Sequence, residues 1–137
     1  MILDTYRDVF SRIYVCSPSI SAAASWTPVK TYSQNNLKVD LEREKCLFDD
    51  YIPEELEAVI KRCQKRNNHN MKKSILVIVD DFADSKASSG NPPTLNQLYV
   101  EGRHNAINSI TSTQKFTALR AIIRGNSRQL FFIRLRN

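Results

Sequence analysis

The chain has 137 residues, of which 42% are hydrophobic and 25% are charged. This length and this balance predict a single globular domain with its own core, and they exclude a largely disordered chain. The three glycines do not form the G-x-x-x-x-G-K-[ST] pattern that cradles nucleotide phosphates. The net charge of +6 favours polyanionic partners such as nucleic acid.

The cysteine and hydropathy patterns bear on the cellular compartment. Cys16, Cys46 and Cys63 are odd in number and form no C-x-x-C pair, which predicts a reduced intracellular protein without a cysteine-based metal site. No apolar run approaches the ~20 residues that a membrane-spanning helix needs. The first residues lack the basic start and the long apolar stretch of a signal peptide. We therefore expect an intracellular protein with no membrane partner.

The first third of the chain predicts short elements separated by polar residues. Residues 4–10 are expected to end a helix, and residues 12–16 are expected to form an apolar strand that stops before Pro18. The polar stretch 19–36 is expected to be a loop, and a second short strand is expected over residues 45–48.

A helix is predicted to begin at Pro53, because proline suits the first helical position and the two glutamates that follow suit the first turn. Four apolar residues at helical spacing predict one buried stripe: Leu56, Val59, Ile60 and Cys63. The basic residues beyond this stripe are either a solvated helix end or a contact for the phosphate backbone of DNA. Those assigned to DNA contact are Lys65, Arg66, Lys72 and Lys73.

Two adjacent carboxylates follow the most apolar segment of the chain. Five branched apolar residues, 75–79, predict a strand buried on both faces, as in a parallel sheet covered by helices. Asp80 and Asp81 come directly after them, at the strand end where open α/β sheets bind ligands. In a nucleotide-hydrolysing site the first carboxylate holds Mg²⁺ and the second orients the attacking water. The alternative is that both acids only cap the strand and solvate a loop.

The second half of the chain alternates helices and strands. A helix is predicted from residues 91–93 onward, a strand over 106–113, a short helix over 117–124 and a last strand over 129–135. This alternation predicts an α/β fold with a mainly parallel sheet. Gln114 ends the strand that is expected to lie beside the Asp81 strand. Its amide either senses a γ-phosphate or positions water, or it only terminates the strand.

Three arginines are candidates for contacts with phosphate. Arg103, at the predicted end of a helix, is either an arginine finger for a neighbouring subunit or a surface residue that suits the helix C-terminus. Arg124 and Arg128 are candidates for phosphate or DNA contacts.

The chain resembles a known family over nearly its whole length. Residues 78–84 (Ile-Val-Asp-Asp-Phe-Ala-Asp) are similar to the Walker B region of the viral genome-packaging ATPases of large DNA viruses, the poxvirus-type branch of the FtsK/HerA superfamily of P-loop NTPases. Further segments resemble the family in the same order along the chain: 12–19, 95–99, 102–104, 112–116, 123–126 and 132–137.

This resemblance implies a three-layer α/β sandwich with a RecA-like P-loop NTPase core. It implies hydrolysis of ATP with Mg²⁺ by a homo-oligomeric ring that drives double-stranded DNA into a capsid, in the host cytoplasm or the virion, with capsid proteins as further partners. By the resemblance Asp80 holds Mg²⁺, Asp81 activates water and Gln114 is the sensor. Many relatives have Asp-Glu where this chain has Asp80-Asp81, so its second carboxylate reaches less far.

The resemblance also implies that part of the nucleotide site is not contained in this sequence. In the family, the Walker A loop and its strand precede the segment that matches residues 4–16. Residues 1–137 are therefore expected to be one partial ATPase domain that lacks the strand of the phosphate loop and hydrolyses no ATP alone. A sheet without that strand is expected to expose apolar edges, which favours association.

Two other functions remain open. The first is a non-catalytic DNA-binding or interaction module that keeps the fold and the basic surface of such an ATPase, and the missing phosphate loop supports it. The second is a metal-dependent nuclease or phosphatase that uses Asp80, Asp81 and Asp84. The second is less favoured, because no further histidine or acidic cluster completes a two-metal site.

Overall fold

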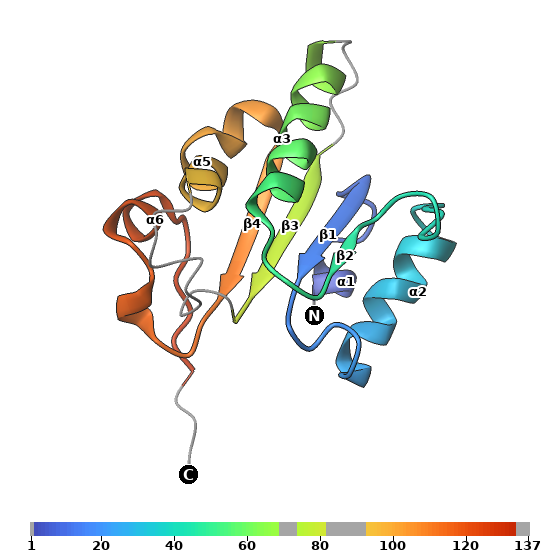
Figure 1. Ribbon diagram of the computed structural model, residues 1–137, viewed down its shortest axis with the longest axis horizontal. Helices are drawn as coiled ribbons and strands as arrows, with labels where there is room; N and C mark the ends of the chain where they lie inside the picture. The colour runs from blue at the N-terminus through green and yellow to red at the C-terminus, as the bar shows by residue number, and fades with distance from the viewer. Residues whose placement is uncertain (1, 69–73, 82–92, 134–137) are drawn as a thin grey trace.

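The described strands form one parallel sheet (Figure 1). The computed structural model describes residues 2–68, 74–81 and 93–133. Its strands are β1 (Arg12–Cys16), β2 (Leu47–Phe48), β3 (Ile75–Asp80) and β4 (Ile107–Ser112). Their order across the sheet is β2-β1-β3-β4, and every neighbouring pair is parallel. This confirms the α/β class and the parallel sheet that the sequence predicts.

Helices flank the strands along the described parts of the chain. The α-helices are α1 (Ile2–Thr5), α2 (Thr27–Asn35), α3 (Pro53–Asn68), α5 (Pro93–Glu101) and α6 (Ala121–Asn126). The 3₁₀ helices are η1 (Ala24–Trp26), η2 (Gly102–Asn105) and η3 (Phe116–Ala118). Among the described residues, no helix combines the length and the apolar character that crossing a bilayer requires.

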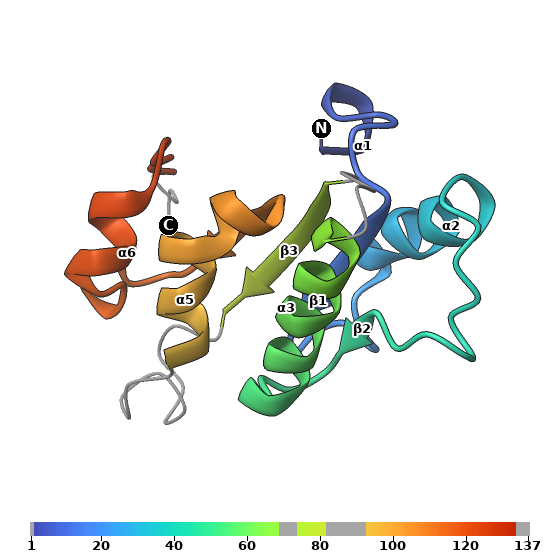
Figure 2. The same cartoon turned by 90° about the horizontal axis from the view of Figure 1, so that it is seen from above.

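Strand β3 is buried on both faces because its side chains alternate between two cores. Ile75, Val77 and Val79 pack with side chains of α3 and α5, whereas Leu76 and Ile78 pack with side chains of α2. Figure 2 shows α3 and α5 on one side of the sheet and α2 on the other. Helices therefore cover both faces of the sheet, an arrangement that is compatible with the predicted three-layer fold.

The cysteines lie in the interior. Cys16 on β1, Cys46 just before β2 and Cys63 on the buried stripe of α3 are reduced cysteines within the larger core. Burial raises the pKa of Cys16 and that of Cys46 to about 12, because a thiolate is poorly solvated there. At neutral pH both side chains are neutral and pack as small apolar groups.

The prediction of a loop over residues 19–36 is wrong, because this stretch contains η1 and α2. Pro28 lies in the first turn of α2, where proline is tolerated. Val29 and Tyr32 are one helical turn apart and both pack against the core on the α2 side of the sheet. The polar composition hides a helix that is stabilised by this packing rather than by helix propensity.

The predicted last strand over 129–135 is also wrong for its described part. Residues 129–133 form no strand, and residues 134–137 lie outside the described residues. Leu130, Phe131, Phe132 and Ile133 are instead exposed to solvent. An apolar run of this kind indicates a strand, but a strand also needs a neighbour, and in the described sheet none lies beside this segment.

The two weaker helix predictions hold only in part. Of residues 4–10, only Asp4 and Thr5 are helical, and Asp8 has a φ of 62°, in the left-handed region that a right-handed helix excludes. The helix predicted over 117–124 is divided into η3 and α6, with Leu119 and Ile123 buried in the larger core.

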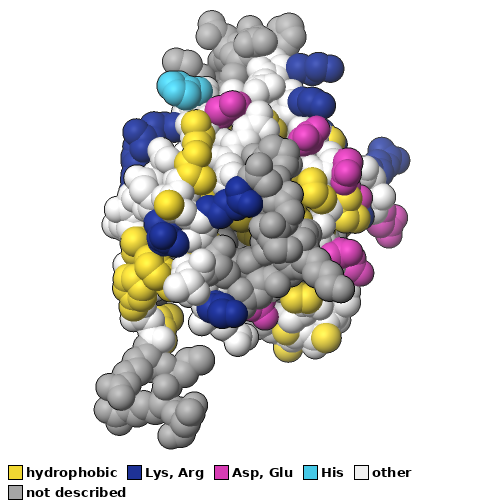
Figure 3. Space-filling view, turned by 60° about the vertical axis from the view of Figure 1, so that its left-hand side comes forward, with side chains coloured by type: hydrophobic (Ala, Val, Ile, Leu, Met, Phe, Trp, Pro, Cys, Tyr) yellow, Lys and Arg dark blue, Asp and Glu magenta, His cyan; other side chains and the backbone are white. Residues whose placement is uncertain are grey.

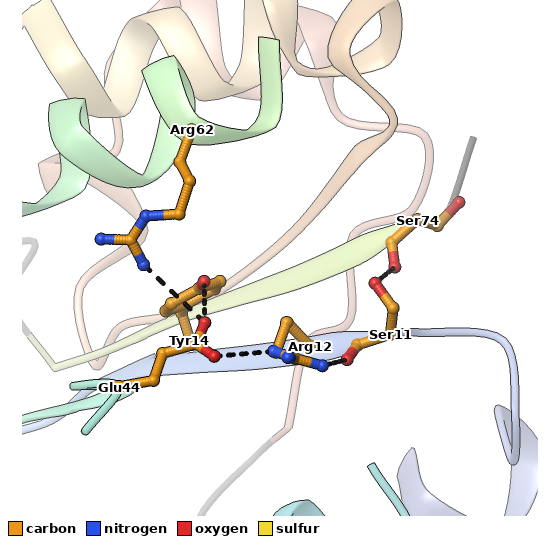
Figure 4. A network of polar contacts seen from close by, with 6 residues as sticks. All are labelled: Ser11, Arg12, Tyr14, Glu44, Arg62 and Ser74. Atoms are coloured by element: carbon orange, nitrogen blue, oxygen red, sulfur yellow. Dashed lines mark hydrogen bonds and ion pairs between the residues drawn. The ribbon is translucent and has the colours of Figure 1, made fainter. Parts of the chain in front are cut away.

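A polar network joins β1 to the loop before β2 and to α3 (Figure 4). The hydroxyl of Tyr14 donates to Glu44 Oε1 at 2.8 Å, and Arg12 Nε donates to Glu44 Oε2 at 2.9 Å. Arg62 Nη1 on α3 lies 3.7 Å from Glu44 Oε1. Burial alone would raise the pKa of Glu44, but the hydrogen bonds from Tyr14 and Arg12 and the two arginine charges outweigh it and lower that pKa.

We expect this network to make stability depend on pH in the acid range. A lowered pKa in the folded state stabilises the fold fully above the ordinary glutamate pKa of about 4.3, and the contribution is lost as the pH falls through the folded value. Glu44→Gln should lower the free energy of unfolding by about 1 kcal/mol at pH 7 and make less difference in acid. Urea unfolding at several pH values between the acid range and pH 7 measures this free energy. Glu42→Gln is the control, because Glu42 is exposed. Parallel pH profiles for Glu44→Gln and the unmodified chain would contradict this role.

Candidate functional site

Polar side chains follow three neighbouring strands at the same edge of the sheet. In the register of the sheet, Cys16 at the end of β1 pairs with Val79, and Asp80 at the end of β3 pairs with Ser112 on β4. Because all the strands are parallel, their carboxyl ends meet at one edge. The residues that come next on each strand are Ser17, Asp81 and Thr113.

Asp80 is held by a serine that follows β1. The hydroxyl of Ser17 donates to Asp80 Oδ2 at 2.9 Å, and Ser17 is 0% exposed. The hydroxyl oxygens of Ser17 and Ser19 lie 2.9 Å apart, and Trp26 Nε1 donates to Ser19 Oγ at 3.2 Å. These contacts fix one oxygen of the Asp80 carboxylate at the edge of the sheet.

The sequence alone does not predict Ser17 and Ser19 as site residues. The available signal was two serines around Pro18, directly after an apolar strand. On sequence alone these residues only mark the end of the strand. Their role depends on the pairing of β1 with β3, which brings Ser17 to Asp80 across 63 positions of the chain.

Asp81 has an unusual backbone conformation. Its φ is 59°, in the left-handed region that aspartate and asparagine adopt more readily than most residues. The Asp81 N–H donates to the carbonyl oxygen of Ser112 at 3.1 Å, which extends the pairing of β3 and β4 by one residue. The Asp81 side chain is exposed at the edge of the sheet. It is free of the serine network that holds Asp80.

Gln114 lies in a short turn after β4. Thr113 Oγ1 accepts a hydrogen bond from the N–H of Lys115 at 3.2 Å and donates to the Lys115 carbonyl at 3.3 Å, so the chain folds around Gln114. The Gln114 side chain is exposed. The structure places it at the same edge as both aspartates, and among the described residues no hydrogen bond joins it to either of them.

Arg103 is at the opposite edge of the sheet. It lies in η2, which comes before β4, whereas Asp80 is the last residue of β3. With six residues in β4, the two edges are about 20 Å apart, at about 3.3 Å per residue. Arg103 is exposed and therefore cannot reach Asp80 within one copy of the chain. A role as an arginine finger would require a neighbouring subunit.

The predicted DNA contacts are only partly described. Lys65 and Arg128 are exposed. Arg124 donates to the carbonyl of Leu119, and its guanidinium lies over the Phe116 ring at 5.2 Å, so it is engaged within the chain. The side chain of Arg66 and all of Lys72 and Lys73 lie outside the described residues. On the face in Figure 3, lysine and arginine side chains are scattered rather than gathered in one patch.

The chemistry of this edge suits a cation that brings most of its own ligands. Among the described residues, no group of three or more His, Cys, Asp or Glu side chains could hold a metal ion, and Asp84 lies outside them. Mg²⁺ commonly binds through one or two carboxylates and takes its other ligands from water and substrate phosphates. Asp80 could supply such a carboxylate.

The chain was compared with protein-family models, with curated proteins and with solved structures, and none of the three comparisons found a match.

Proposed function

We propose that the chain is part of the ATPase of a DNA-packaging motor, which couples ATP hydrolysis to the translocation of double-stranded viral DNA into a capsid. The observation that carries the proposal is the placement of Asp80 and Asp81. Asp80 ends a central strand whose other residues are buried on both faces, Asp81 directly follows it, and one carboxylate oxygen of Asp80 is already held by Ser17. The family resemblance supports the same reading, because its segments occur in the expected order.

The proposed roles follow from how each side chain is held. Asp80, partly buried and fixed by Ser17, would bind Mg²⁺ together with the phosphates of ATP. Asp81, exposed beside it, would orient the attacking water, and Gln114 on the next strand end would contact the γ-phosphate. When bound, Mg²⁺ would neutralise charge that develops on the phosphate oxygens. A RecA-like core is part of this proposal.

The phosphate-binding loop must come from outside these 137 residues. Triphosphate binding needs a loop of backbone N–H groups and a lysine, and the sequence contains no such pattern. Without that loop, Asp80 and Asp81 would repel ATP. We therefore expect the chain alone to release no phosphate from ATP above background, with or without DNA.

A chimera tests the proposal directly. The phosphate-loop segment of a characterised poxvirus-type packaging ATPase is joined to residues 1–137, which replace that enzyme's own matching segment. We expect Mg²⁺-dependent phosphate release that is abolished by Asp80→Ala, while the 137-residue chain alone stays inactive. The parent enzyme with the same junctions is the control. A folded chimera without turnover beside an active control, or turnover that survives Asp80→Ala, would refute the proposal.

The runner-up is a non-catalytic DNA-binding module, favoured by the absent phosphate-loop pattern and the net charge of +6. Such binding would be independent of DNA sequence and would weaken steeply with salt. Fluorescence anisotropy with labelled duplex DNA measures this binding. The double variant Lys65→Ala with Arg128→Ala tests whether these two residues contribute to it. An inactive chimera together with salt-sensitive binding that this double variant weakens would favour the runner-up over the ATPase.

A further inference from the structure

Strand β4 presents one unpaired side. The carbonyl of Ala106, just before β4, accepts a hydrogen bond from the N–H of Ile75 at 3.0 Å, and the carbonyl of Ser112 accepts one from the N–H of Asp81, just after β3, at 3.1 Å. Successive residues of a strand direct their backbone groups to opposite sides, so the even-numbered residues of β4 pair with β3. In the described sheet no strand lies on the other side of β4. The residues whose N–H and C=O groups point to that side are Ile107, Ser109 and Thr111.

This edge also lacks the features that normally prevent strand addition. Natural edge strands are protected by charged side chains, proline or bulges. The sequence of β4 is Ile-Asn-Ser-Ile-Thr-Ser, which contains neither a charge nor a proline. Six residues of β4 pair with β3 in an unbroken register, so no bulge twists the edge away. Gly102 of η2 lies close to the carbonyl of Ile107, so the part of the edge that is open to pairing with a further strand runs from Ser109 to Thr111.

The same chain carries a segment suited to such pairing. Leu130 to Ile133 are four consecutive apolar residues rich in β-forming types, a pattern typical of a strand buried on both faces. In the structure they form no strand, and Phe131 and Ile133 are 80% and 84% exposed. Phe132 has an aromatic partner, Phe116, at 5.2 Å between ring centroids. Figure 3 shows a group of hydrophobic side chains on the lower left of the face that it presents.

We propose that two copies of the chain associate by strand exchange, in which residues 130–133 of each copy add to the β4 edge of the other. One copy contains both the acceptor edge and the donor segment, and its own segment does not pair with its own edge. In a reciprocal exchange, the β4 edge and the segment 130–133 of each copy both pair with the other copy, and the two copies form a closed two-fold dimer. The inference concerns the 137-residue chain and does not rest on the proposed ATPase role.

Two kinds of variant separate the acceptor from the donor. Ser109→Pro removes an outward N–H that β3 does not use, and proline is tolerated on edge strands, so it should block acceptance without disrupting the sheet. Ser109→Ala is the matched control, since it keeps the N–H and removes a buried hydroxyl that has no partner. Phe131→Ser with Ile133→Ser changes two exposed side chains and should block donation.

Sedimentation from about 1 to about 100 μM measures the association, with circular dichroism to confirm folding. We expect a dimer for the unmodified chain and for Ser109→Ala, and at least a tenfold weaker association for Ser109→Pro and for the donor variant. The two weakened variants mixed together should form a heterodimer through one remaining exchange. A monomer at every concentration would overturn the proposal, and so would a dimer that neither Ser109→Pro nor the donor variant weakens. The β4 edge would then not be the acceptor of residues 130–133 from a second copy. If Ser109→Pro does not fold, the donor variant decides.

Discussion

Val77→Asp is expected to abolish folding. Val77 is 0% exposed at the centre of β3, between Tyr14 on β1 and Ser109 on β4. A carboxylate there would be buried without a partner, which costs several kcal/mol. That is a large share of the stability of a typical domain, about 5–15 kcal/mol.

The measurement compares this variant with a matched substitution on the surface. Val100→Asp makes the same chemical change at a position on α5 that is 46% exposed, so it should leave the unfolding transition almost unchanged. Circular dichroism and urea unfolding should show no cooperative transition for Val77→Asp. A transition near the midpoint of the unmodified chain would mean that β3 is not the centre of the core.

Asp81→Asn in the active chimera should lower turnover by at least about 100-fold and leave nucleotide binding within a few-fold. The amide keeps the size of the side chain but cannot accept a proton from water or orient it as a carboxylate does. Its effect therefore falls on the transition state more than on bound ATP. Steady-state phosphate release and binding of a fluorescent nucleotide separate the two quantities.

The backbone of Asp81 makes asparagine the appropriate replacement. Asparagine adopts the left-handed region, where Asp81 has its φ of 59°, more easily than alanine does. A loss of activity in Asp81→Ala would mix backbone strain with the loss of the carboxylate. Asp49→Asn is the control, since Asp49 is exposed and directly follows β2 in the same sheet. Equal turnover in Asp81→Asn and Asp49→Asn would exclude Asp81 from the mechanism.

The elements that could be predicted are those whose signals are local. The run 75–79 indicates a strand by its own composition, and the stripe of α3 indicates a helix by its own spacing. Helix α2 was missed because Val29 and Tyr32 stabilise it only by packing on a sheet formed from distant residues. The described part of the strand predicted over 129–135, residues 129–133, was predicted wrongly for the converse reason. Its composition suits a strand, but whether a segment pairs with a neighbouring strand depends on the whole sheet.

The candidate site also contains some residues that have a local sequence signal and others that only the fold brings to the site. Asp80 and Asp81 stand out because two charges directly follow five buried residues. Ser17 has no such contrast with its neighbours, and its bond to Asp80 exists only because β1 and β3 lie side by side. The left-handed conformation of Asp81 could not be read from its identity either, since most aspartates do not adopt it.

The buried thiols have a practical consequence for labelling. Maleimides and iodoacetamide react with exposed thiolates, and the pKa of about 12 at Cys16 and Cys46 leaves almost no thiolate at pH 7. Cys63 is shielded in the same core. A single cysteine introduced at the exposed position of Asp49 would therefore react selectively while all three native cysteines remain in place. In the proposed chimera, a fluorophore attached there would test for nucleotide or Mg²⁺ binding near the carboxyl edge of the sheet while the native cysteines stay unchanged.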